Sequence, residues 1–279
     1  MTLCIAAVCY EKKDLPRLVV STDWKHESGF ASAENQDKLA WIREDWPVLM
    51  AGTMTRAVHL KDTYRTFLDK KSEELKTKYR SEIIDTLNQP LTQFKHKLAD
   101  VLIGSVLGIS YDAFLTAGKS YLPETAFNEL FSAVKRIRMD CQLILPLFIK
   151  GDPFIFRVND EELEYCDNFA AIGSGMDIAE AVLSQRKQDE ECSLAKTIYH
   201  IFEAGKIVSL APPPGVGKDH TIVVFYPPTE GRTVAAKEIS TKGYRFLEEK
   251  FRAYGPRRVG SFTLEDAFLE DADFGSFSP

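Results

Sequence analysis

The chain opens with the stretch MTLCIAAVC, residues 1–9, in which an apolar, β-favouring run begins directly after Thr2. Chain ends fray unless they are tied down, for example as one strand of a sheet. The run predicts a buried strand from Leu3 to Tyr10, and a second strand from Arg17 to Asp23 completes a hairpin around the polar loop EKKDLP. Two interpretations are open: residue 2 is held rigidly because it has a chemical role, or the first strand is simply anchored in a sheet.

Beyond the hairpin, blocks of strands alternate with blocks of helices. Apolar residues recur three or four positions apart after Thr53, which is typical of amphipathic helices, and Pro90 must begin or kink one of them. Further strands are predicted at 38–42, 47–52, 141–149, 154–158 and 221–225, and helices from 53, around 84–101, from 123, at 176–185 and at 193–204. Two apolar sheets that both need cover, with helices available to provide it, predict a single-domain α+β sandwich of sheets faced by helices.

Composition narrows the class of protein. The 279 residues carry a net charge of −6, which argues against a general nucleic-acid binder. No apolar run is long enough for a membrane helix, and the first run lacks the basic flank of a signal peptide, so we expect neither membrane nor export. The five cysteines are scattered without a CxxC pair, which favours reduced thiols in a cytoplasmic protein over disulfides or a zinc site.

Three motifs resemble known sites but fail their patterns. The stretch PGVGKD, Pro214 to Asp219, has Pro212 and Asp219 where a phosphate-binding loop needs Gly and Ser or Thr. The histidines lack the i, i+4 pairing of a zinc hydrolase, and GSGM at 173–176 is not a nucleophile elbow. We therefore expect no metal and no cofactor.

Thr2 offers a different chemistry. Methionine aminopeptidases remove Met1 when the second residue is small, and Thr2 qualifies. Its free α-amine would then have a reference pKa of about 7.7–8.0 and could act as the general base for its own hydroxyl. Such a site needs a nearby cation, a carboxylate that orients the cation, and a backbone N–H for the oxyanion.

Matching residues follow in order along the chain. They are Thr2 before an apolar strand, VVSTD ending at Asp23, Gly29, DKLAWI with Lys38, VLMAGT with Gly52, and AIGSGMDIAEAVL with Ser174. These motifs resemble the proteasome family of N-terminal nucleophile hydrolases, and the chain looks like one of its stand-alone bacterial members. The likeness covers the first ~60 residues and residues 169 to about 225; the middle is similar only in being helices followed by strands.

The resemblance implies a role for each of five residues. Thr2 would be the nucleophile, Asp23 would pair with Lys38, and Lys38 would favour the neutral Thr2 amine. The Gly52 amide would line the oxyanion site, and Ser174 would hydrogen-bond near the new N-terminus. The substrate would be a peptide or another amide.

Several features depart from the family pattern. The late Asp and Ser-Gly-Gly turn are missing from the stretch APPPGVGKDHTIVVF, and Lys25 stands where the family usually has Arg. Asp23 and Lys38 are 15 positions apart, about one residue closer than expected. A catalytically silent proteasome-like scaffold or assembly subunit is therefore the alternative.

Each candidate also has an ordinary structural interpretation. Lys38 could be a surface lysine and Asp23 a turn residue, while Ser174 could cap a helix, with Asp177 completing a capping box. Cys4 lies on the same strand face as Thr2, but its use as a nucleophile would require further trimming, so we interpret it as a core residue.

The resemblance finally implies an architecture. We expect a four-layer αββα sandwich with two antiparallel sheets over residues 1–228 and a helical insert at about 70–121 on its outside. Residues 229–279 would be an extension with a loosely ordered tail from Thr263. The family likeness also implies a homo-oligomer, a ring or a stack of subunits that shelters the site.

Overall fold

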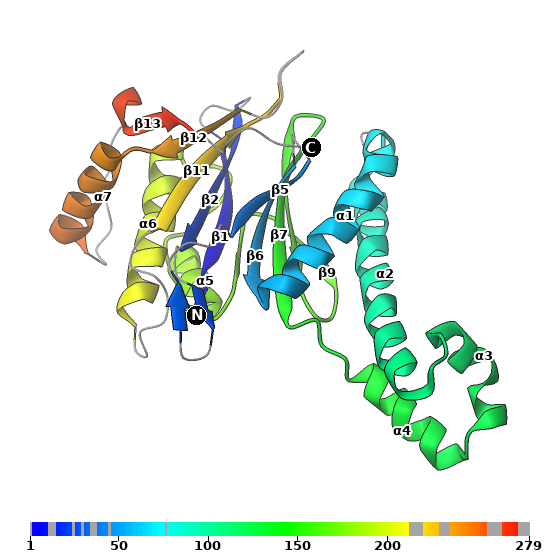
Figure 1. Cartoon of the computed structure of the whole chain (residues 1–279). Helices are drawn as coiled ribbons and strands as arrows, with labels where there is room; N and C mark the ends of the chain where they lie inside the picture. The colour runs from blue at the N-terminus through cyan, green and yellow to red at the C-terminus, as the bar shows by residue number, and fades with distance from the viewer. Residues whose placement is uncertain are drawn as a thin grey trace.

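The computed structural model describes residues 2–10, 15–23, 26–28, 31–33, 38–43, 46–75, 77–211, 220–228, 235–255 and 264–272. Within these residues the chain forms two large antiparallel sheets, a short two-stranded hairpin and seven α-helices (Figure 1). The α+β class and the antiparallel pairing predicted from the sequence are confirmed.

The first sheet has six strands in the spatial order β10-β1-β2-β11-β12-β13. Its strands are β1 (Cys4–Tyr10), β2 (Pro16–Asp23), β10 (Phe169–Ile172), β11 (His220–Tyr226), β12 (Ala235–Ile239) and β13 (Leu269–Asp271). Strand β1, which lies between β10 and β2, is buried on both faces, which explains why its sequence is a continuous apolar run instead of an alternating one.

The second sheet has five strands in the order of the sequence. They are β5 (Leu39–Arg43), β6 (Trp46–Gly52), β7 (Cys141–Ile149), β8 (Asp152–Val158) and β9 (Leu163–Cys166). The separate hairpin pairs β3 (His26–Ser28) with β4 (Ala31–Ala33).

The helices are α1 (Met54–Leu75), α2 (Arg80–Leu107), α3 (Tyr111–Tyr121), α4 (Glu124–Lys135), α5 (Met176–Gln185), α6 (Leu194–Leu210) and α7 (Thr241–Tyr254). Three of them begin at a serine whose hydroxyl accepts a backbone N–H of the first turn: Ser110, Ser193 and Ser240. Pro90 lies inside α2, so it does not begin a helix.

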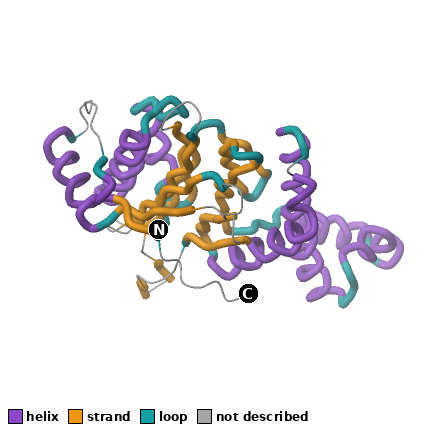
Figure 2. The backbone as a smooth tube through the Cα atoms, turned by 90° about the horizontal axis from the view of Figure 1, so that it is seen from above, coloured by secondary structure: helices purple, strands orange, loops and turns teal. Residues whose placement is uncertain are grey.

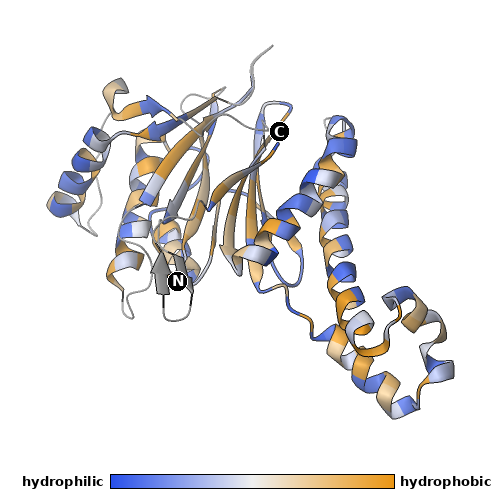
Figure 3. Ribbon diagram, in the orientation of Figure 1, coloured by the Kyte–Doolittle hydropathy of each residue, from blue (hydrophilic) through white to orange (hydrophobic). Residues whose placement is uncertain are grey.

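Three apolar clusters hold the layers together. One lies between the two sheets and includes Cys4, Val20 and Ile144. A second packs α1 and α2 on the outer face of the β5–β9 sheet, and a third packs α5 and α6 on the outer face of the six-stranded sheet. The sheets therefore face each other with helices on both outer sides (Figures 1 and 2), and their strands are mostly apolar (Figure 3).

The helical segment that connects β6 to β7 runs from Met54 to Lys135. It contains the predicted insert at about 70–121, together with the helices predicted from 53 and from 123. Helices α3 and α4 extend away from the sandwich (Figure 1) and have a small apolar cluster of their own, in which the rings of Phe114 and Phe127 stack with centroids 4.7 Å apart.

The end of the chain contributes to the fold more than the sequence predicts. Strand β12 pairs with β11, and β13 pairs with β12 in turn. Within the tail expected to be loosely ordered from Thr263, residues 264–272 contact the rest of the fold: the side chain of Phe268 is buried and its carbonyl accepts the N–H of Ser240. Residues 273–279 lie outside the described part of the chain.

A buried polar network joins β1 to α6. Gln188 Nε2 donates to the Val8 carbonyl at 3.1 Å and to the Thr197 hydroxyl at 3.1 Å, while Gln188 Oε1 lies 2.8 Å from His200 Nδ1. Burial, followed by the positive charge of Arg186, lowers the pKa of His200 to about 4, so this imidazole is neutral near pH 7.

Two properties of the described residues bear on membrane and metal binding. No single helix there has both the length and the apolarity needed to cross a membrane, while the bent pair α2 and α3 reaches them together, by length and composition only. The same residues contain no group of three or more His, Cys, Asp or Glu side chains placed to hold a metal ion.

Candidate active site

Thr2 lies at the start of β1, against the turn between β10 and α5. Its N–H donates to the hydroxyl of Ser174 at 3.2 Å, a contact between residues that are 172 positions apart in the sequence. Thr2 itself is half-buried, whereas Ser174 is exposed. The segment that leads into β1 is therefore anchored at Thr2 by a side chain from a distant part of the sequence.

Asp23 and Lys38 form an ion pair next to Leu3, the residue that follows Thr2. Lys38 Nζ lies 2.7 Å from Asp23 Oδ1, and both side chains are completely shielded from solvent. The same oxygen accepts the N–H of Leu3 at 2.7 Å. Because Asp23 ends β2 and Lys38 precedes β5, the pair joins one sheet to the other.

This geometry removes two of the ordinary structural interpretations. Asp23 and Lys38 are each only 1% exposed, so Lys38 is not a surface lysine and Asp23 is not a solvated turn residue. Burying an ion pair costs several kcal/mol per ion in lost hydration, which the attraction between the partners must offset. A protein gains little stability from such a pair, so its position beside residue 2 calls for another explanation.

The β10–α5 turn is built from two glycines around Ser174. Gly173 has φ +91°, and a Cβ added there would lie 2.2 Å from the Thr2 carbonyl oxygen, so only glycine lets the turn approach Thr2 this closely. The N-cap of α5 is Gly175, without a side-chain cap. The interpretation of Ser174 as an N-cap with Asp177 is therefore wrong, because the Ser174 hydroxyl is engaged with Thr2 instead.

Gly52 ends β6 in the second sheet. Its φ is +88°, and a Cβ there would lie 2.4 Å from the carbonyl oxygen of Asp140, so the position requires glycine. Gly52 is exposed, and the preceding Ala51 pairs with Gln142 on β7. Through Gln142, this strand end is linked to the turn that holds Thr2.

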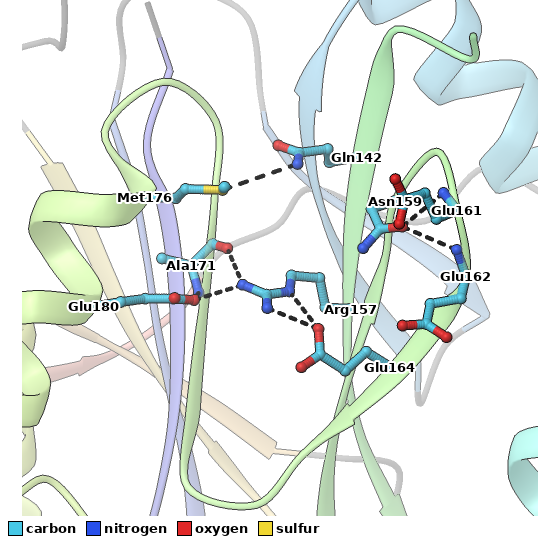
Figure 4. A network of polar contacts seen from close by, with 9 residues as sticks. All are labelled: Gln142, Arg157, Asn159, Glu161, Glu162, Glu164, Ala171, Met176 and Glu180. Atoms are coloured by element: carbon cyan, nitrogen blue, oxygen red, sulfur yellow. Dashed lines mark hydrogen bonds and ion pairs between the residues drawn. The ribbon is translucent and has the colours of Figure 1, made fainter. Parts of the chain in front are cut away.

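Gln142 is a part of the site that the sequence analysis did not single out. Its Oε1 accepts the N–H of Gly173 at 2.9 Å. Its Nε2 lies 4.0 Å from the sulfur of Met176, the first residue of α5, and Figure 4 shows this contact. The available signal was a polar residue in the otherwise apolar strand CQLILPLFI. In a strand buried on both faces, such a residue must have a partner.

A charged network lies next to the turn between β10 and α5. Arg157 on β8 bonds Glu180 of α5 at 2.6 Å and Glu164 of β9 at 2.7 Å (Figure 4). Glu180 also accepts the N–H of Ala171 at 3.1 Å. This network therefore connects β10 and α5 to the second sheet. Its contact on β10, Ala171, lies two residues before Gly173.

Cys4 is a core residue, as predicted. It is fully buried between the sheets, and its thiol donates to the Met50 carbonyl at 3.4 Å. Burial, reinforced by the nearby Asp23 charge, raises the pKa of the Cys4 thiol well above its usual value. A thiol that is both inaccessible and protonated is a poor nucleophile.

Some of the sequence predictions fall on residues outside the described part of the chain. These are Met1, Lys25, Gly29 and the stretch 212–219, which contains GVGK and most of the late region where the family pattern is missing. The structure connects four of the predicted site residues: Thr2 bonds Ser174, the neighbouring Leu3 bonds Asp23, and Asp23 bonds Lys38. The fifth, Gly52, follows Ala51, which pairs with Gln142.

Comparison with known proteins does not assign the chain to a family: no protein-family model matches it, and no curated protein is detectably similar to it in sequence.

Proposed function

We propose that this chain is an N-terminal threonine hydrolase of peptide or other amide bonds, with Thr2 as the nucleophile once Met1 has been removed. The fold would be the four-layer sandwich of the N-terminal nucleophile hydrolases, and the family the proteasome-like one that the sequence motifs resemble. Asp23, Lys38, Gly52 and Ser174 would complete the site.

The observation that carries the proposal is the buried Asp23–Lys38 pair bonded to the backbone of Leu3. The pair stabilises the fold little for its cost. It lies one residue from Thr2, however, where a fixed positive charge has a chemical use: it favours the neutral form of an amine at residue 2, the form that can accept a proton.

The proposed reaction begins when Thr2 Oγ attacks the carbonyl carbon of the substrate amide. The hydroxyl proton passes to the Thr2 amine, directly or through a water. The tetrahedral adduct then expels the amine half of the substrate, which takes that proton, and leaves an ester on Thr2. Water adds to the ester, the acid half of the substrate is released, and the Thr2 hydroxyl is restored.

The remaining residues would hold the reacting groups in place. The N–H of Gly52 would donate to the oxyanion of the tetrahedral adduct, which is where backbone donors contribute most to rate. Ser174, already 3.2 Å from the Thr2 nitrogen, would orient the amine. We further propose a cytoplasmic homo-oligomer, a ring or stack that shelters the site; light scattering that gives a strict monomer would contradict this part.

Labelling with a peptide epoxyketone, followed by peptide mapping, tests the proposal. The reagent forms two bonds, one from the hydroxyl to the ketone carbon and one from the amine to the epoxide. A double adduct on Thr2 therefore requires both groups on a free N-terminal residue. Thr2→Ser should still be labelled, whereas Thr2→Ala should not. Thr66→Ala, which removes an exposed threonine hydroxyl on α1, is the matched control and should label like the native chain.

Intact mass separates the proposal from the silent scaffold. Native protein that retains Met1 would have no free Thr2 amine and would favour the scaffold. Loss of Met1 without any adduct in a folded protein, or an adduct on Cys4, would show that the assignment of Thr2 is wrong.

A further inference from the structure

Strand β10 is the outermost strand of its sheet, and it contacts β7 and β8 of the second sheet and helix α5. Edge strands carry backbone N–H groups without a neighbouring strand, and these need other partners when they are covered. Here two alternate N–H groups are satisfied by side chains: Ala171 by Glu180, and Gly173 by Gln142. The second of these lies directly beside Ser174.

Gln142 contacts both ends of the turn that carries Ser174. Its Oε1 accepts the N–H of Gly173, the residue before Ser174. Its Nε2 lies near the sulfur of Met176, two residues after Ser174 (Figure 4). The turn is closed by a hydrogen bond from the Met176 N–H to the Gly173 carbonyl at 3.2 Å. The side chain of Gln142 therefore spans a small, closed loop whose outward group, the Ser174 hydroxyl, accepts from Thr2.

The backbone of Gln142 has a second neighbour of interest. On β7 it pairs with Ala51 of β6, and the next pair in the register joins Gly52 with Cys141. One residue is thus fixed by its backbone to the strand end that carries Gly52 and by its side chain to the turn that carries Ser174. These two groups come from different sheets.

We propose that Gln142 is a positioning residue of the active site, which sets the Ser174 hydroxyl, and with it the Thr2 amine, relative to the Gly52 N–H. The inference rests on the proposed function, because it assigns to Gln142 the alignment of groups that act in that reaction. Gln142 acts through Gly173 and Ser174. A displacement of about 1 Å in such an alignment can cost on the order of 100-fold in rate.

The test uses the full chain with Met1 removed and measures the rate of epoxyketone labelling at Thr2. Gln142→Leu removes the acceptor for Gly173 and should slow labelling about tenfold or more. Glu180→Gln is the matched control, since its amide oxygen still accepts from Ala171 on the same strand edge while its ion pair with Arg157 is lost. This variant reports whether weaker attachment of the β10 edge alone slows the reaction. Its labelling rate at Thr2 should stay within about threefold of the native rate.

Gln142→Glu provides a readout that a merely structural role would not change. Its carboxylate still accepts from Gly173 but brings a negative charge toward the Thr2 amine. A negative charge favours the protonated amine, so the pH profile of labelling should move upward by roughly half a pH unit or more. This variant also keeps the test decisive if Gln142→Leu fails to fold.

The outcomes distinguish the two proposals. A native chain that lacks Met1 and shows no adduct on Thr2 overturns the proposed function, and the role of Gln142 with it. A native chain that is labelled, with Gln142→Leu labelled within about twofold of it and the Gln142→Glu profile unmoved, overturns the role of Gln142 alone.

Discussion

Replacing Lys38 by methionine should destabilise the protein severely, whether or not the chain is an enzyme. The substitution keeps most of the apolar stem and removes the charge that lies 2.7 Å from Asp23 Oδ1. At an effective dielectric constant of about 20, two unit charges at that distance attract by about 6 kcal/mol. The variant loses this attraction and leaves a carboxylate that is still buried.

The net loss is smaller than the attraction, because Lys38 no longer has to be dehydrated. Breaking a buried pair by removing one partner typically costs about 3–5 kcal/mol, and we expect Lys38→Met to fall in that range. The double variant Asp23→Asn/Lys38→Met should recover a large part of the loss, since no charge remains buried and the asparagine oxygen can still accept the Leu3 N–H. Both variants should be inactive, so the double variant should regain stability without regaining activity.

Urea unfolding, followed by tryptophan fluorescence and far-UV circular dichroism, measures the effect. Lys71→Met is the matched control: it makes the same substitution in a pair of similar length, 2.6 Å to Glu74, whose side chains are 45% and 42% exposed. It should leave the unfolding midpoint nearly unchanged. If Lys38→Met lowers the midpoint no more than Lys71→Met does, or if the double variant is no more stable than Lys38→Met, the reasoning about the buried pair is refuted.

Three further predictions follow from particular contacts. The pKa of His200 lies below its usual value, so between pH 6.5 and 4 the unfolded chain binds a proton that the folded chain does not. The free energy of unfolding should therefore fall by up to about 3 kcal/mol over this range. Unfolding curves measured across the range should show a flatter pH dependence for His200→Gln. Gly173→Ala should lower stability and Thr2 labelling more than Gly151→Ala, because both glycines have φ near +90° but only at Gly173 would the new Cβ collide with backbone; equal effects in thermal unfolding would contradict the collision. Lys38→Ala should reduce labelling of Thr2 by roughly 10²–10⁴-fold, in variant protein shown by circular dichroism to be folded, and a rate within tenfold of native would exclude Lys38 from the reaction.

Much of this protein can be predicted from its sequence, because the relevant patterns are local. The apolar run after Thr2, the alternation of strand and helix blocks, and the α+β class are readable from residue spacing, and the structure confirms them. The antiparallel pairing of the sheets, which the structure also confirms, was implied by the family resemblance and the order of the elements. Asp23 and Lys38 were identifiable as candidates only because their motifs resemble a known family. Nothing in their immediate neighbours distinguishes a buried ion pair from two surface charges.

The tertiary structure decided the contacts between residues far apart in the chain. It places Thr2 against Ser174 across 172 positions, buries Asp23 with Lys38 between two sheets, and gives Gln142 a partner in Gly173. It also adds β12 and β13 to the first sheet, so that two short segments of the C-terminal extension form strands. The physical reason is that burial and hydrogen-bond pairing depend on which surfaces meet, whereas the sequence specifies directly only which surfaces are apolar.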